Sequence, residues 1–170
     1  MSTILLTIKQ ETPNDYDLIY QIHNVAFGQN NESALINNLR KTSQYDSRLS
    51  LVALMDSKAV WLILFYPLNI KTKDGLIPTL GLVPLGVVPK FQNQGVGSEL
   101  IKKGLSMAKK LGHKSVIIAG DPNFYGQFGF KLVSSIENNI GEPLNHFMFL
   151  ELEPDSLKHI HGVVEYPPEF

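Results

Sequence analysis

The segment VVPKFQNQGVGS, residues 87–98, carries the strongest pattern in this 170-residue chain. It lies between a predicted strand and the most regular helical pattern, so it predicts a strand, a glycine loop and a helix start in that order. Glycine lets the backbone approach an anion without a Cβ in the way, and the first amides of a helix have no acceptor within the helix. Together with the helix dipole, this arrangement predicts a phosphate site. A glycine turn that merely starts a helix is the alternative.

Two common nucleotide-binding motifs do not fit this segment. A P-loop needs a Lys-Ser or Lys-Thr pair after its last glycine, where this chain has Ser98 and Glu99. A dinucleotide fingerprint needs a third glycine at the position of Leu100, and it normally follows the first strand of a βαβ unit. What remains is Gln-x-x-Gly-x-Gly over Gln92–Gly97, with a Val-x-Pro lead-in at Val87–Pro89.

Composition narrows the class of protein. The 15 basic and 16 acidic residues give a formal net charge of −1, which weighs against a nucleic-acid binder. The lack of cysteine excludes disulfides, thiolate metal sites and a cysteine nucleophile. The longest apolar run, Ala59–Tyr66, is far shorter than the ~20 residues of a membrane helix, and no signal-peptide pattern opens the chain. We expect one domain over residues 1–170, cytoplasmic, with no nucleic-acid or membrane partner.

Hydrophobic periodicity predicts alternating strands and helices. The predicted strands are Ile4–Ile8, Leu51–Met55, Ala59–Tyr66, an interrupted Leu76–Val88, Ser115–Ala119, Lys131–Ser134 and Phe147–Leu152. The predicted helices are one opened by Pro13-Asn14-Asp15, one at Glu32–Arg40 and one at Ser98–Leu111, and a turn-rich stretch follows Ala119. This order predicts a mixed α/β (α+β) fold.

The Gln-x-x-Gly-x-Gly pattern with its lead-in resembles motif A of the GNAT superfamily of acetyl-coenzyme A dependent N-acetyltransferases. The block FYGQFGF, residues 124–130, is similar to that superfamily's Tyr-x-x-x-Gly-Phe element. The resemblance implies a helix at Tyr125 that must be short, because residues 120–123 lead almost directly to this tyrosine. Leu85–Val87, Gly120–Pro122 and Tyr166–Phe170 are similar to the YhbS-like subgroup of small bacterial members. The resemblance implies a GNAT-like fold, with a central, mostly antiparallel sheet that is splayed around the acyl-coenzyme A site and has helices on both faces.

The resemblance also implies which residues hold the cofactor. The pyrophosphate would sit on the amides of Gln92–Ser98, and the pantetheine arm would pair with the strand end Leu85–Val88 as a pseudo-strand. The implied cofactor-binding residues are Leu85, Gly86, Val87, Val88, Gln92, Asn93, Gln94, Gly95, Val96, Gly97, Ser98, Phe124, Tyr125 and Phe128. No metal is expected, because His159 and His161, which could share one strand face, supply only two ligands.

The implied chemistry is transfer of an acetyl group from acetyl-coenzyme A to an amine by direct attack in a ternary complex. By this analogy the backbone N–H of Val87 stabilises the oxyanion and Tyr125 protonates the departing thiolate. The alternative for Tyr125 is a packed aromatic residue. A base is needed if the amine has a pKa of ~10.4, and Glu32, acting through water, is the first candidate before Asp121 and His146.

Other functions stay open at this stage. The protein could be a non-catalytic acyl-coenzyme A sensor or interaction domain that keeps the loop without the chemistry. A third hypothesis is a nucleotide- or phosphosugar-binding enzyme that uses the same helix start. The sequence identifies neither the amine nor the length of the acyl chain. It is compatible with a homodimer as well as with a monomer.

Overall fold

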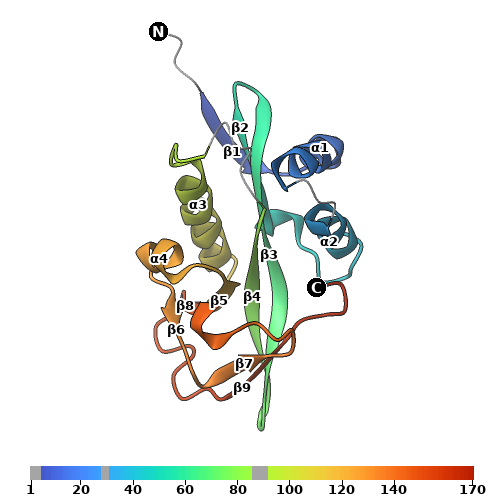
Figure 1. The fold of residues 1–170 in the computed structure, drawn as a ribbon. Coiled ribbons are helices and arrows are strands. Elements are labelled where there is room, and N and C mark those ends of the chain that lie inside the picture. The colour runs from blue at the N-terminus through green and yellow to red at the C-terminus, as the bar shows by residue number, and fades with distance from the viewer. Residues whose placement is uncertain (1–4, 28–30, 86–91) are drawn as a thin grey trace. The chain divides into compact units, whose positions relative to one another are not determined.

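A computed structural model describes residues 5–27, 31–85 and 92–170, without the side chains of residues 22–27, 31–32 and 84–85. The helices are α1 (Tyr16–Phe27), α2 (Asn31–Leu39), α3 (Val96–Lys110) and α4 (Pro122–Tyr125) (Figure 1). The strands are β1 (Leu6–Gln10), β2 (Ser50–Met55), β3 (Lys58–Thr72), β4 (Gly75–Leu85), β5 (Ser115–Ala119), β6 (Lys131–Leu132), β7 (Ile136–Asn138), β8 (Phe147–Glu151) and β9 (Gly162–Glu165). Within the described ranges, no helix is long and apolar enough to cross a membrane.

The chain forms two compact units, each built from two segments of sequence. The first unit comprises Met1–Leu64 and Val83–Met107, and the second comprises Phe65–Leu82 and Ala108–Phe170. Strands β3 and β4 and helix α3 therefore contribute residues to both units. The expectation of one domain over residues 1–170 stays a prediction.

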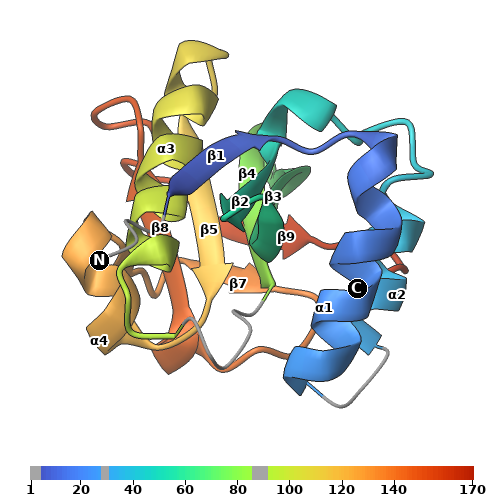
Figure 2. The same ribbon diagram turned by 90° about the horizontal axis from the view of Figure 1, so that it is seen from above.

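The first unit is built on the antiparallel strands β1, β2 and β3. Asp56 and Ser57 both have positive φ, at 47° and 65°, between the paired residues Met55 and Lys58. Two left-handed positions are what a two-residue hairpin requires. Within this unit α1 and α2 lie on one side of β2 and β3, and α3 lies on the other (Figures 1 and 2). Side chains on both faces of β2 are accordingly buried.

The second unit joins parallel and antiparallel pairs. Strand β4 pairs in parallel with β5, at Leu80 with Val116 and Gly81 with Ile117. Strand β5 pairs antiparallel with β8, which also pairs with β6. Strand β9 pairs antiparallel with β3 and parallel with β7. The predicted mixed α/β class with a mostly antiparallel sheet is confirmed. The predicted splay falls partly on residues 86–88, outside the described residues, and stays a prediction.

Several strands extend beyond their predicted ends, because hydrogen-bonded pairing with a neighbouring strand continues past the residues that show the hydrophobic pattern. Strand β1 continues two residues beyond Ile8, since its register with β2 runs on to Gln10 and Leu51. Strand β3 passes through Pro67 to Thr72, since its distal part pairs with β9. Strand β4 is continuous from Gly75 to Leu85, so the described part of the predicted Leu76–Val88 strand is not interrupted, and residues 86–88 lie outside the described residues.

The C-terminal part holds two short strands that the sequence did not predict, β7 and β9. Such short strands show too little alternation to be recognised, and they form by pairing with each other. The predicted His-x-His strand face is also wrong. His159 lies in a turn with φ 60°, and His161 precedes the first residue of β9, Gly162.

A buried carboxylate connects the elements of the first unit. Glu11, which follows β1, is 4% exposed, and its oxygens accept hydrogen bonds from Arg40 Nη2 at 2.6 Å and Arg40 Nε at 3.1 Å. The hydroxyls of Tyr45 and Ser50 donate to Glu11 at 2.7 and 2.6 Å. Burial and the neighbouring carboxylate raise the pKa of Tyr45 far above its usual value. The Arg40 guanidinium stacks on the ring of Tyr16 at 4.0 Å. This network joins the ends of β1 and α2 to the starts of β2 and α1.

Arg40→Ala should lower the free energy of unfolding by about 3 kcal/mol or more, because it leaves the buried Glu11 carboxylate without its counter-charge. Chemical denaturation measures this loss. The matched control is Arg48→Ala, which removes an ion pair of the same 2.6 Å length, to Asp46, that is largely exposed to solvent. Equal losses in the two variants would contradict the role assigned to Glu11.

Candidate active site

The predicted phosphate loop lies directly before α3 in the first unit. Its described part runs from Gln92, and residues 92–95 form an exposed turn before α3 begins at Val96. The Glu99 N–H donates to Gly95 O at 3.1 Å and closes the first turn of the helix. By helix geometry, the amides that precede this bond have no acceptor inside the helix. The local structure is therefore the donor arrangement that an anion site needs.

The two glycines of this motif are required for different physical reasons. Gly95 has φ +75°, a left-handed conformation, and a Cβ there would meet nothing within 4 Å. At Gly97 a Cβ would overlap ring atoms of Trp61 on β3. The predicted reason for both glycines is the approach of an anion, and the structure adds a packing reason at Gly97. Trp61 was not among the predicted site residues. Its only distinguishing feature in the sequence is that it is the sole tryptophan of the chain and therefore bulky.

Gly97→Ala is expected to destabilise the protein by about 3 kcal/mol, because its methyl group overlaps a large ring in a packed interior. Gly95→Ala should cost only about 1 kcal/mol, since it introduces backbone strain at an open position. Chemical denaturation compares the two variants. Adding Trp61→Leu to Gly97→Ala should recover part of the lost stability. If Gly97→Ala destabilises the protein no more than Gly95→Ala does, Gly97 is not required for packing.

Several predicted site residues lie beyond what the structure describes. Gly86, Val87 and Val88 lie outside the described residues. Leu85 is the last residue of β4, and Glu32 lies in the first turn of α2, but neither side chain is described. The predicted roles of these residues therefore stay predictions.

The second predicted block forms a very short helix in the second unit. The Asp121 carboxylate caps α4 by accepting a hydrogen bond from the backbone N–H of Asn123 at 2.9 Å, and Pro122 occupies the first turn. A 3-10 turn, Gly126–Phe128, continues the helix, and Gly129 ends it with φ 94°. The expectation of a short helix before and through Tyr125 is confirmed.

Tyr125 is buried in an aromatic cluster, with 8% of its surface exposed. Its ring meets Phe124 and Phe130 edge to face, with centroids 5.0 and 5.9 Å apart, and Phe124 meets Phe128 at 5.5 Å. A Cβ on Gly120 would collide with the Tyr125 ring, so this glycine permits the packing. Burial raises the pKa of Tyr125 to about 12. The hydroxyl therefore stays protonated at neutral pH. The ring that carries it also packs in the aromatic cluster.

The other base candidates occupy positions with a structural use. Asp121 is the cap of α4, and His146 is an exposed residue whose backbone oxygen accepts from Gly120 N–H at 2.9 Å. These contacts give both residues a structural role, and they do not test whether either residue acts as a general base. In the part of the chain that the structure describes, no group of three His, Asp or Glu side chains could hold a metal ion.

Comparison with known proteins identifies the family. Residues 7–133 match the model of the acetyltransferase (GNAT) domain. The chain is 29% identical over 168 residues to an uncharacterized N-acetyltransferase, YhbS, of Escherichia coli strain K12, and the match covers 97% of this chain and 98% of that protein. The chain therefore belongs to the GNAT family of acetyltransferases, and it is an acyltransferase.

Two solved structures resemble the whole chain. The crystal structure of Escherichia coli YhbS in complex with CoA has a TM-score of 0.90 and 26% identity, and the match covers 100% of this chain and 94% of that one. A GNAT family acetyltransferase from Brucella melitensis in complex with acetyl-CoA has a TM-score of 0.80 and 29% identity, with 98% of both chains covered. Fold and family thus agree with the two sequence blocks that carried the resemblance.

Proposed function

We propose that this protein transfers the acetyl group of acetyl-coenzyme A to an amine, on a small molecule or an exposed protein site, by direct attack in a ternary complex. Membership of the GNAT family supports the reaction, and the two whole-chain structural relatives were crystallised with CoA and acetyl-CoA. The observation that carries the proposal is the glycine turn that leads into the 15-residue helix α3, whose first amides have no acceptor within the helix.

The cofactor is proposed to bind mainly through backbone donors. The amides of Gln92–Ser98 hold the pyrophosphate, Leu85–Val88 pairs with the pantetheine arm, and Phe124, Tyr125 and Phe128 add contacts. Two nearby lysines already have partners in the first unit: Lys102 lies 3.4 Å from Glu99, and Lys103 donates to the Ile8 oxygen at 3.0 Å. Because its formal net charge is −1, the protein as a whole produces no positive electrostatic field that would attract an anion. Local amides therefore supply most of the attraction.

In the proposed reaction the amine nitrogen attacks the thioester carbon, the C–N bond forms and the C–S bond breaks. The amine loses one proton and the sulfur gains one. The backbone N–H of Val87 stabilises the oxyanion, and the Tyr125 hydroxyl donates to the departing sulfur. Since Tyr125 has a pKa of about 12 and a thiol one of ~8.5, complete transfer of its proton to the thiolate is uphill. Tyr125 therefore acts chiefly by hydrogen bonding to the thiolate as charge develops.

The need for a base depends on the amine. A lysine-like amine with a pKa of ~10.4 costs about 4.6 kcal/mol to deprotonate at pH 7, whereas an α-amino group costs about 1 kcal/mol. Glu32, acting through water, remains the first candidate base, ahead of Asp121 and His146. A cytoplasmic location and a homodimer also stay predictions.

Asn93→Asp tests the phosphate site by adding one negative charge with almost no change in size. Asn93 is exposed and has φ 59°, a conformation that aspartate also tolerates. The affinity for acetyl-coenzyme A should fall at least about tenfold, because the new charge repels the pyrophosphate. The fluorescence of Trp61, whose ring packs at Gly97, follows the titration.

The control for this test is Asn38→Asp, the same change at an exposed position on α2, which should bind normally. If acetyl-coenzyme A at millimolar concentration changes neither the Trp61 fluorescence nor the melting temperature of the unaltered protein, the proposal is wrong. Stabilisation by ATP or NAD without coenzyme A would favour the nucleotide-binding alternative.

Tyr125→Phe keeps the ring contacts and removes only the hydroxyl. We expect kcat to fall about 10²–10³-fold, as for the loss of one hydrogen-bond donor to a developing charge, with unchanged affinity for acetyl-coenzyme A. In the unaltered protein the raised pKa of Tyr125, about 12, keeps the donor protonated as pH rises, so its titration should cause no loss of rate up to about pH 10. An unchanged kcat in Tyr125→Phe would show that the residue only packs. Tight binding without turnover of any amine would favour the sensor alternative.

A further inference from the structure

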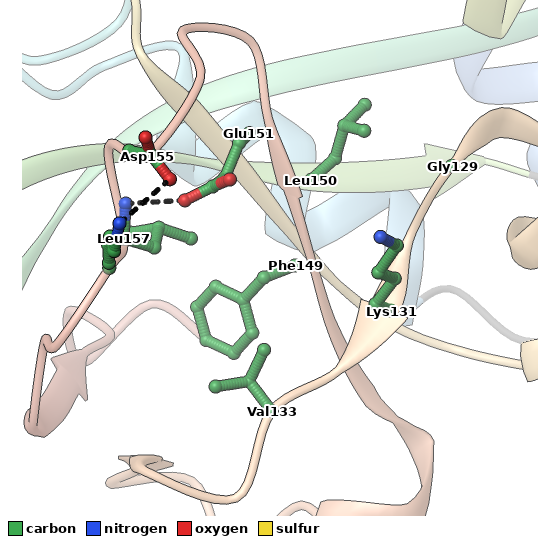
Figure 3. Close-up of a pocket in the computed structure, with 9 residues that line it drawn as sticks. Gly129, Lys131, Val133, Phe149, Leu150, Glu151, Asp155 and Leu157 are labelled. Carbon is green, nitrogen blue, oxygen red and sulfur yellow. Dashed lines mark hydrogen bonds and ion pairs between the residues drawn. The ribbon is translucent and has the colours of Figure 1, made fainter.

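A hollow in the second unit lies among residues that the proposed reaction does not use (Figure 3). It is bounded by Lys131 on β6, by Phe149 and Glu151 on β8, and by Asp155 and Leu157 in the turn that follows. Its volume of about 560 Å³ is in the range of small-molecule sites.

The floor of the hollow is apolar and well supported. Phe149 and Leu157 are 3% and 9% exposed, and Val133 lies beside them. The Phe149 ring is fixed edge to face against Phe147, with centroids 5.0 Å apart at 90°. Such a floor favours an aliphatic or aromatic group of a ligand.

The rim of the hollow carries charged side chains of both signs. Lys131 is exposed and forms no ion pair with any residue that the structure describes. Glu151 accepts the backbone N–H of Leu157 at 2.7 Å through Oε1, and the Asp155 carboxylate lies 3.8 Å from Nζ of Lys158, which also lines the hollow. Figure 3 shows Lys131 on one side of the Phe149 ring and the two carboxylates on the other. Both signs of charge are therefore available to a bound molecule.

We propose that this hollow binds a small zwitterion of the α-amino acid class with an apolar side chain. The carboxylate of the ligand pairs with Lys131, its ammonium group pairs with Glu151 and Asp155, and its side chain covers Phe149. A carboxylic acid alone would leave Glu151 without a cationic partner, and an amine alone would leave Lys131 without an anionic one. Because the charged groups are exposed, the affinity lies near the millimolar range.

The test uses the full chain labelled with ¹⁵N and L-leucine as the probe, added up to about 20 mM to cover affinities of this order. Amide signals of Gly129, Phe149 and Leu157 should shift in a saturable way. Lys131→Met and Glu151→Gln should each weaken binding about two- to fivefold, since each removes one partly screened charge pair. The glutamine keeps an oxygen for the Leu157 N–H, so the turn is preserved. Lys109→Met, at an exposed site on α3, is the control and should bind normally.

Two analogues separate the zwitterion from simpler ligands. The acid 4-methylpentanoate lacks the ammonium group, and 3-methylbutylamine lacks the carboxylate, so both should bind more weakly than L-leucine. The proposal is overturned if L-leucine shifts none of the lining amides, if either analogue binds as tightly, or if both charge-removing variants bind as the unaltered protein does.

Discussion

The contact between Trp61 and Gly97 is the constraint on which the proposed phosphate site depends. Trp61, on a strand, has the largest side chain of any residue type, and it faces Gly97 in the first turn of α3. Glycine is the residue type that leaves room for the ring there. The ring thereby sets how closely the start of the helix approaches β3. Helix amides that bind an anion must be held in place before the anion arrives, since otherwise their ordering would reduce the affinity. Packing at Gly97 thus serves binding at the amides beside it.

The buried Glu11 network provides a second constraint in the same unit. Replacing such an ion pair by apolar residues often stabilises a protein, so its retention is weak evidence for stability. It does require four segments to meet in one arrangement, since a half-formed network leaves a buried charge without a partner. We infer that the network specifies how α1 and α2 sit on the strands of the first unit. Those helices carry Glu32, the first candidate base.

Tyr125 packs within an aromatic cluster and is also the hydrogen-bond donor of the proposed reaction. The same burial that fixes its ring between Phe124 and Phe130 raises the pKa of its hydroxyl to about 12. Such a hydroxyl is a poor acid but a reliable donor, because it stays protonated over the whole physiological range. For a departing thiolate, a fixed donor in an apolar setting stabilises the developing charge at little cost of reorganisation.

The local pattern was enough to predict the glycine loop before α3 and the mixed α/β class, because these depend on residues close together in the chain. The family resemblance added the short helix at Tyr125. Strand ends, β7 and β9 could not be predicted in this way, since they exist through pairing with distant segments. The sequence by itself determined the family and the residues that carry its motifs. Only the tertiary structure revealed why Gly97 must be glycine, how Glu11 is paired and how Tyr125 is tuned. Each of these depends on neighbours that the chain brings together only when it folds.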